Sequence, residues 1–202
     1  MNKRELASKT HRRYIASPVV AKRAEGAEGE WQPATIDGIA SKVGESYNLG
    51  WFRERIEPGA FDDCLGDDVR CLFNHDNNYV LGRTTSGTLE LFLNDDGHLA
   101  YRYQTPNRSY ARDLEDMILS GDISQSSFQF TISDYRWEME DGEDLLVITK
   151  MERLYDVAPV TFPASQSTEV QAKRSLDLIG APEKRFKKLE KMQRRFKLLS
   201  LK

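Results

Sequence analysis

The sequence predicts a mainly β fold, a β-barrel with a few helices, followed by a C-terminal helix. Between residues 31 and 172, short segments of alternating apolar and polar residues are separated by closely spaced turn residues. Alternation with a period of two is typical of strands that bury one face. Helical periodicity occurs in two places, at 107–120 and 183–201. Many short strands with one or two covering helices favour a barrel.

The N-terminal part of the chain contains a tail and the first strands. Residues 1–30 mix charged and small residues without periodicity, so we expect a mobile segment with a short strand at 14–16. A first long strand is expected at 31–40. The next, at 53–56, ends at the turn imposed by Pro58-Gly59.

The clearest β-structure is a hairpin around Asp96-Gly97, flanked by alternating segments at 89–93 and 99–103. The period then changes to that of a helix with four apolar positions on one face: Tyr110, Leu114, Met117 and Ile118. Asn107 or Ser109 is the expected N-cap, and Gly121 the expected stop.

A second hairpin is predicted around 140–143, with its return strand at 145–148, and a separate strand carries Asp156. The chain ends in a linker and a basic amphipathic helix within 173–202. We therefore divide the chain into a mobile segment (1–30), a barrel domain (31–172) and this C-terminal part.

Charge is unevenly distributed along the chain. Residues 31–172 contain 11 basic and 25 acidic residues, whereas 173–202 contain 11 basic and 3 acidic residues. An acidic domain repels nucleic acid, so we expect no nucleic-acid binding through the barrel. The basic helix is expected to pack on its own domain or on a dimer mate, with docking to another protein as the alternative and contact with nucleic acid ranked lowest.

The two cysteines, Cys64 and Cys71, have no histidine or second cysteine pair at zinc-ligand spacing. We expect reduced, half-buried thiols, and no metal or cofactor. No segment approaches the roughly 20 apolar residues that span a bilayer, so we expect a soluble protein without membrane contact.

A candidate nucleophile lies where a serine-rich turn runs into an alternating strand, at 121–132. Phe128, Phe130 and Ile132 share one face of that strand, and Ser127 lies on the other. Ser127 is therefore expected off the core, where it can meet a substrate. Ser124 and Ser126 are neighbouring hydroxyls, and residue types alone do not decide among the three.

A serine nucleophile needs a base to accept its proton. His11 lies in the basic N-terminal segment and His98 follows a hairpin turn, whereas His75 follows the apolar run 69–73, where a buried strand reaches the surface. Asp156, an acid in an otherwise apolar strand, is the best candidate to orient the imidazole. Asp76 is the rival acid, although adjacent residues on a strand point to opposite faces.

Several ordered blocks of sequence, within roughly 36–167, resemble the prohead maturation proteases of tailed bacteriophages. The blocks are Ile56–Phe61, Phe73–Asp76, Leu81–Leu89, Gly121–Phe130 and Val157–Ala164. These proteases are similar to herpesvirus assemblin, a serine protease on a closed β-barrel. Carried over by position, the resemblance implies that His75 is the base, Ser127 the nucleophile and Asp156 the third member.

The resemblance also implies substrates and a location. The expected substrates are the scaffolding region of the major capsid precursor, or a scaffolding protein, and the protease itself, cut inside the procapsid in the host cytoplasm. Self-cleavage would remove the basic C-terminal segment. The analogy with assemblin also admits a homodimer. Oxyanion donors are expected to be backbone N–H groups or an arginine, with Arg83 and Arg112 as candidates.

The chain departs from the family pattern at Gln125 and Gln129, where glycine is common. Glycine allows close approach of a substrate, so these residues are expected to alter the cleft. The competing function is a catalytically inactive assembly or scaffolding protein on the same barrel. A third function, nucleic-acid binding through the basic tail, is opposed by the acidic domain.

Overall fold

The computed structural model describes residues 10–23, 31–49 and 52–162. The elements run in this order: β1 (His11–Lys22), β2 (Thr35–Ser41), β3 (Ser46–Asn48), β4 (Arg53–Ile56), β5 (Arg70–Leu72), η1 (Phe73–His75), β6 (Val80–Arg83), η2 (Thr84–Ser86), β7 (Glu90–Leu93), β8 (Leu99–Gln104), α2 (Ser109–Ser120), β9 (Gln125–Glu140) and β10 (Glu143–Val160). The mainly β class predicted from the sequence is confirmed. The expected C-terminal helix and its linker lie outside the described residues.

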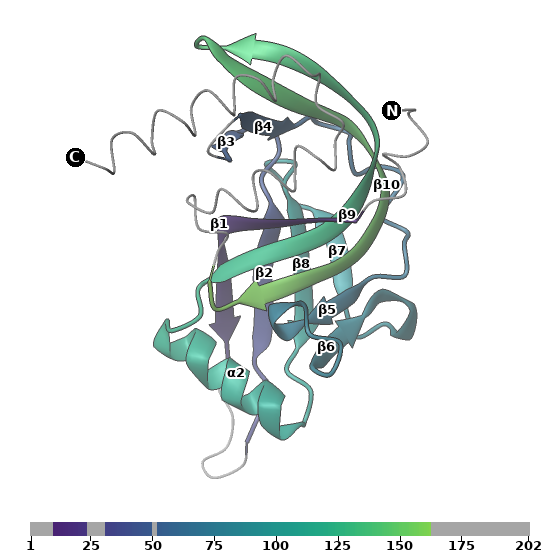
Figure 1. The fold of residues 1–202 in the computed structure, drawn as a ribbon. Helices are drawn as coiled ribbons and strands as arrows, with labels where there is room; N and C mark the ends of the chain where they lie inside the picture. The colour runs from purple at the N-terminus through teal and green to yellow at the C-terminus, as the bar shows by residue number, and fades with distance from the viewer. Residues whose placement is uncertain (1–9, 24–30, 50–51, 163–202) are drawn as a thin grey trace, which may run out of the picture.

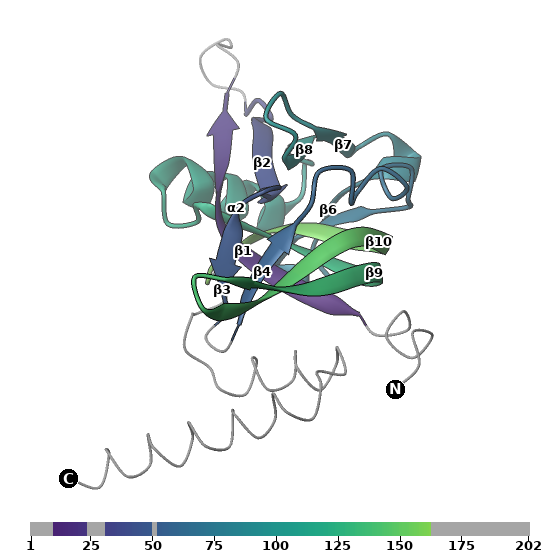
Figure 2. The same ribbon diagram turned by 90° about the horizontal axis from the view of Figure 1, so that it is seen from above.

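The strands form one sheet that curls into a half-barrel, with α2 at one end (Figure 1). Its order is β3-β4-β10-β9-β1-β2-β8-β7, and β5 pairs with both β10 and β6. β10 runs parallel to β4 and β5, and the other pairs are antiparallel. Figure 2 shows the sheet from above, with β9 and β10 crossing in front of β1.

The N-terminal segment differs from our expectation. β1 is a strand of 12 residues, not a short strand in a mobile segment. Its first half pairs with β9, opposing Tyr14 to Ser127, and its second half pairs with β2, opposing Val19 to Gly38. This strand joins the two halves of the sheet. Its hydrogen bonds to two partners stabilise it despite weak apolar periodicity, because strand stability depends on the neighbours.

The hairpin predicted around 140–143 is confirmed, but its strands, β9 and β10, are longer than predicted, and β10 includes the strand that we predicted separately around Asp156. They contain 16 and 18 residues, and the register shifts at several places, including Ile148/Lys150 and Leu154/Asp156. Such bulges insert extra residues and bend a strand. They interrupt the alternation of side chains without ending the strand, so the sequence pattern looked like separate elements.

The predicted core face of the serine strand is confirmed, since Phe128, Phe130 and Ile132 are buried. The ring of Phe128 stacks on Phe130 at 4.7 Å between centroids and meets Phe61 edge-on at 5.9 Å. Aromatic pairs of this kind contribute beyond their buried area. This cluster anchors the strand from which Ser127 projects.

The predicted helix is present as α2, and Gly121 ends it in a left-handed conformation with φ of 86°. The predicted cap is wrong. The N-cap is Arg108 and its side chain makes no capping hydrogen bond; its guanidinium donates to the carbonyl of Val80 at 2.6 Å instead. On the buried face, Glu115 accepts from the backbone N–H of Ala34 at 3.0 Å and ties the helix to the sheet.

Candidate active site

Three neighbouring strands converge on one point of the sheet. β10 lies between β9 and β5 and carries Asp156, which is opposite Gln129 of β9 and Arg70 of β5. β9 carries Ser127, opposite Ala158 of β10. β5 leads directly into η1, which ends at His75. The central strand thus supplies the acid, and its two neighbours supply the serine and the histidine.

The turn that presents His75 has an unusual backbone. Asn74 and His75 both have positive φ, at 55° and 58°. Left-handed residues other than glycine are uncommon, with asparagine and histidine among the exceptions. Such conformations cost about 1–3 kcal/mol each and persist where surrounding contacts hold them. Here they fold the chain sharply after β5 and direct the imidazole back over the sheet.

The predicted site residues are brought together in hydrogen-bonding contact. Nε2 of His75 lies 2.6 Å from Oγ of Ser127, and Nδ1 lies 2.5 Å from Oδ1 of Asp156. An ionised carboxylate only accepts, so it selects the tautomer with the proton on Nδ1. Nε2 then has its lone pair directed at the serine hydroxyl. This is the arrangement that general-base activation of a serine requires.

The hydroxyl of Ser127 has a second acceptor. Its Oγ lies 2.8 Å from the backbone carbonyl of Arg13 on β1. A serine hydroxyl has one proton to donate, so Nε2 of His75 and the carbonyl of Arg13 compete for it. When the proton points to the carbonyl of Arg13, the hydroxyl of Ser127 does not donate to His75.

The burial of the site differs from our expectation. Ser127 is 0% exposed, and His75 and Asp156 are each 5% exposed. We expected Ser127 off the core and open to substrate. It does project from the face opposite Phe128, but η1 and the backbone of β1 lie against it. A buried polar set of this kind persists because its members satisfy one another.

The two rival serines have other surroundings. Oγ of Ser126 lies 2.9 Å from the hydroxyl of Tyr101, both residues being fully buried. It therefore points to the opposite face from Ser127, as strand alternation requires. Ser124 precedes β9 and is exposed. Of the three hydroxyls, Ser127 is the one bound to His75.

The rival acid and the rival histidine also have structural partners. Oδ1 of Asp76 accepts from the backbone N–H and the side-chain amide of Asn78, at 2.9 and 2.8 Å, and so closes the turn after His75. Nδ1 of His98 accepts from the backbone N–H of Val43 at 3.1 Å. The side chain of His11 lies outside the described residues.

The two arginines considered as oxyanion donors are engaged elsewhere. Arg83 forms a bidentate pair with Asp68 at 2.7 Å, which raises the pKa of the guanidinium and lowers that of the carboxyl. Arg112 stacks over the ring of Trp31 at 5.7 Å. Backbone N–H groups are therefore the better expectation for the oxyanion site.

The two cysteines offer no competing nucleophile. Both are free and fully buried rather than half-buried. Burial raises the pKa of Cys64 to about 12 and that of Cys71 well above its ordinary value, so both remain thiols at neutral pH.

Within the described ranges, no group of three or more His, Cys, Asp or Glu side chains is placed to hold a metal ion. No helix formed by these residues has the length and hydrophobicity to cross a bilayer.

Three contributors to the site were missed by the sequence reasoning. They are the carbonyl of Arg13, the hydroxyl of Tyr101 behind Ser126, and the side chain of Asn74. Only Asn74 had a sequence signal, because asparagine tolerates the left-handed region and stands directly before the candidate base. The other two depend on strand register, which the sequence does not specify.

Comparison with known proteins places the chain in a family. A structural neighbour is the bacteriophage T4 capsid assembly protease, gp21, with a TM-score of 0.51 and 11% identity over 77% of this chain and 98% of that one. At this identity the likeness concerns the fold. No curated protein matches the chain in sequence. The family model of the caudovirus prohead serine proteases matches residues 20–181, and the chain belongs to that family.

Proposed function

We propose that this chain is a serine endopeptidase in which Ser127 is the nucleophile, His75 the general base and Asp156 the group that orients the imidazole. The observation that carries the proposal is the unbroken series of hydrogen bonds from Oγ of Ser127 through both ring nitrogens of His75 to Oδ1 of Asp156. Family membership supports the same reaction.

The reaction follows from this geometry. Oγ of Ser127 attacks the scissile carbonyl carbon while Nε2 of His75 takes the hydroxyl proton. The protonated imidazole, held by Asp156, then gives that proton to the leaving amine as the C–N bond breaks. Water attacks the resulting acyl-enzyme with His75 again as base, which releases the new carboxyl terminus and restores Ser127.

The buried resting state adds one requirement. Because Ser127 has no exposed surface, the site has to open before a substrate carbonyl meets Oγ. Opening has to break the hydrogen bond to the carbonyl of Arg13 and return the hydroxyl proton to His75.

The substrates we propose are the capsid precursor or its scaffolding protein, and the protease itself, cut inside the procapsid in the host cytoplasm. The family description, prohead serine protease, supports the setting. Self-cleavage would remove the basic segment within 173–202, whose 11 Lys and Arg residues contrast with the acidic domain. That segment would then serve as a targeting tail before its removal.

The test is the intact mass of the protein co-expressed with its capsid precursor. Wild type is expected to shorten the precursor or itself, and Ser127→Ala and His75→Ala are expected to leave both chains at full length. Ser124→Ala is the matched control, since that serine is exposed and precedes the strand; it should cleave like wild type. Equal masses for wild type and Ser127→Ala, in folded proteins, would contradict the proposal.

The competing function is a catalytically inactive assembly protein on the same fold. It is favoured by the burial of Ser127 and by Gln129, whose side chain accepts from Arg12 at 2.6 Å where the family commonly has glycine. An assembly protein would retain its effect on capsid formation after Ser127→Ala and would never process itself. The same co-expression experiment therefore separates the two functions.

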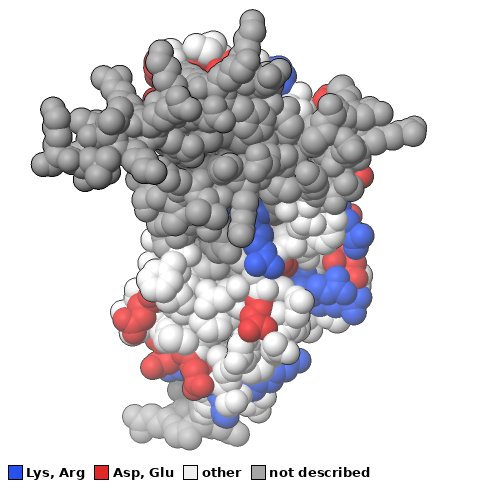
Figure 3. Space-filling view, viewed as in Figure 1, with Lys and Arg blue, Asp and Glu red and all other residues white. Residues whose placement is uncertain are grey.

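Nucleic acid is not among the proposed partners. On the face shown in Figure 3, the described residues place Lys and Arg among Asp and Glu in small groups, without an extended basic region. Binding to a phosphate backbone needs a continuous basic surface. The homodimer expected by analogy with assemblin stays a prediction. Sedimentation measurements would test it.

A further inference from the structure

The turn that carries His75 is attached to the far end of β10 by one side chain. Oδ1 of Asn74 accepts from the backbone N–H of Thr161 at 2.9 Å, and Nδ2 of the same amide donates to Oγ1 of Thr161 at 3.0 Å. Thr161 directly follows the last residue of β10. Both polar atoms of one asparagine side chain thus bind one residue, a contact we name the Asn74–Thr161 clasp.

The clasp closes a loop around the proposed catalytic contacts. β10 provides Asp156, and Thr161 stands five positions later, directly after the strand. η1 provides Asn74, which binds Thr161, and the next residue, His75, which binds Asp156. The turn is therefore fixed to β10 at two points, once through each of two consecutive side chains. Two fixed points define the rotation of the turn about β10, which one contact alone would leave free.

The backbone explains why a clasp is needed. Asn74 and His75 are both in the left-handed region, which costs free energy unless surrounding contacts hold it. Asparagine lowers that cost, and its amide supplies the holding contact. A turn released from Thr161 can relax toward ordinary φ values, which would carry the imidazole away from Oγ of Ser127.

We propose that Asn74 is a positioning residue of this protease, which acts through the Asn74–Thr161 clasp to hold His75 in line with Ser127 and Asp156. The inference rests on the proposed function of these three residues. Asn74 itself touches neither the serine nor the acid among the contacts that define the site. Misplacement of a catalytic group by about 1 Å costs about 100-fold in rate, so a loosened turn has a measurable effect.

The variants separate the effect of backbone conformation at position 74 from the effect of the two hydrogen bonds of the clasp. Asn74→Gly keeps the left-handed conformation without strain but loses both hydrogen bonds. Asn74→Asp tolerates that conformation and still accepts from the N–H of Thr161, while the hydroxyl of Thr161 turns to donate. Thr161→Val removes one of the two bonds from the other side. Asn77→Ala is the matched control, because Asn77 is an exposed asparagine in the same loop.

The measurement is the rate at which a small fluorophosphonate labels Ser127 in the full chain, since this probe requires an activated serine but no peptide subsites. Asn74→Gly is expected to remain folded and to slow labelling about 10- to 100-fold. Asn74→Asp is expected to restore most of the rate, and Asn77→Ala to match wild type. Asn74→Gly combined with Thr161→Val should be no slower than Asn74→Gly alone, because both remove the same clasp.

A second readout does not depend on activity. The Nδ1 proton of a histidine bound to a carboxylate gives a far-downfield NMR signal, which is expected in wild type and lost or shifted in Asn74→Gly. A folded Asn74→Gly protein with the wild-type signal and the wild-type labelling rate would overturn the positioning role. If wild type itself resists labelling, the proposed function fails, and the NMR signal alone decides whether the clasp positions His75.

Discussion

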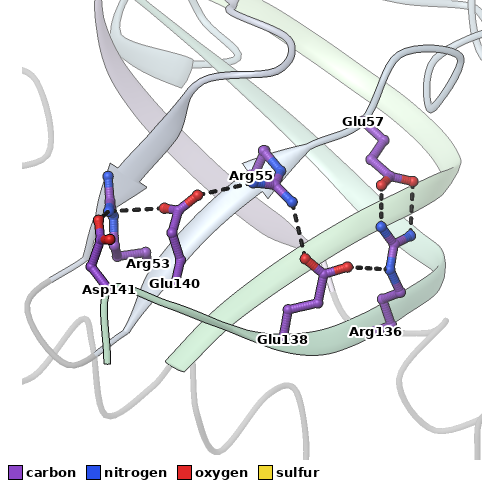
Figure 4. Close-up of polar contacts among 7 residues, drawn as sticks. All are labelled: Arg53, Arg55, Glu57, Arg136, Glu138, Glu140 and Asp141. Atoms are coloured by element: carbon purple, nitrogen blue, oxygen red, sulfur yellow. Dashed lines mark hydrogen bonds and ion pairs between the residues drawn. The ribbon is translucent and has the colours of Figure 1, made fainter. Parts of the chain in front are cut away.

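The two ends of the β9–β10 hairpin use polar side chains in opposite ways. At one end, Ser127 and Asp156 are buried with His75 in a single hydrogen-bonded series. At the tip, charged side chains of β4, β9 and the segments that follow them form a partly exposed ladder (Figure 4). Its members are Arg53, Arg55, Glu57, Arg136, Glu138, Glu140 and Asp141.

The ladder has redundant contacts. Arg55 pairs with both Glu138 and Glu140 at 3.0 Å, and Arg136 pairs with both Glu57 and Glu138. Exposed pairs are worth little individually, and loss of one leaves a charge that water or a neighbour can solvate. At the buried end each group has a specific partner and almost no exposure to solvent. The same hairpin therefore tolerates substitution at its tip and is sensitive at its base.

The largest effect is expected at Asp156, the proposed orienting acid. Asp156→Asn preserves the shape of the site but favours the wrong tautomer of His75, so the rate of precursor cleavage should fall about 10⁴-fold. The double variant with His75→Ala should be little worse than His75→Ala alone, because the members act as a unit. The rates come from cleavage of purified precursor followed by gel densitometry. Additive losses would indicate that the two residues act separately.

The next largest effect is expected on the free energy of unfolding, at the buried ion pair between Arg13 and Glu54 beside the site. Arg13 donates twice to Glu54, at 2.7 and 2.6 Å, and both residues are buried. Glu54→Ala leaves the Arg13 charge without its partner, so the free energy of unfolding should fall by about 3–5 kcal/mol. Urea denaturation measures this. Glu57→Ala at the tip is the matched control, with an expected loss below about 1 kcal/mol. Similar losses of stability for Glu54→Ala and Glu57→Ala would show that the two ends of the hairpin do not differ in their sensitivity to substitution.

An intermediate effect is expected at Gly38. A Cβ added there would lie 2.2 Å from the ring of Tyr101, a fully buried side chain. Since the ring is fully buried, it can move only by displacing its neighbours, so Gly38→Ala should cost about 1–3 kcal/mol of stability. The displaced ring would also weaken the contact with Ser126, next to the proposed nucleophile. A thermal midpoint equal to wild type would show that Tyr101 moves without cost.

The smallest effect is a pH dependence at the tip. The hydrogen bonds from Arg136 lower the pKa of Glu57 below its ordinary value of 4.5. A lowered pKa in the folded state stabilises the protein above the unfolded-state pKa, and the stabilisation is lost as the pH falls through the folded value. Glu57→Gln should therefore be slightly less stable than wild type at pH 7, and the difference should shrink below pH 4.5. Urea denaturation at several pH values checks this, and a difference that grows on acidification would contradict it.

Residue patterns predicted much of the buried end. Alternation assigned Phe128, Phe130 and Ile132 to the core face, and this placement is confirmed. The period of the helix and its glycine stop predicted α2 and its end at Gly121. These signals succeed because they are local: burial of one face and the backbone freedom of glycine act within a few residues of sequence.

Features that depend on register escaped prediction. β1 has few apolar residues at strand spacing and forms because it pairs with β9 and β2. The carbonyl of Arg13 reaches Ser127 only in that pairing. Likewise, β10 contains bulges that interrupt its side-chain alternation, so segments that we predicted as separate short strands belong to one strand. Contacts between residues more than 100 positions apart leave no mark on local periodicity, so neither the cover over Ser127 nor its burial was expected.

The central claim is that His75 and Asp156 activate Ser127 alone among neighbouring serines. The most direct measurement is peptide mapping of the protein after reaction with a small fluorophosphonate. The account predicts one modified residue, Ser127, with labelling absent in Ser127→Ala and slowed at least about 10⁴-fold in His75→Ala. Label on Ser124 or Ser126, or equal labelling of Ser127 with and without the imidazole, would contradict it.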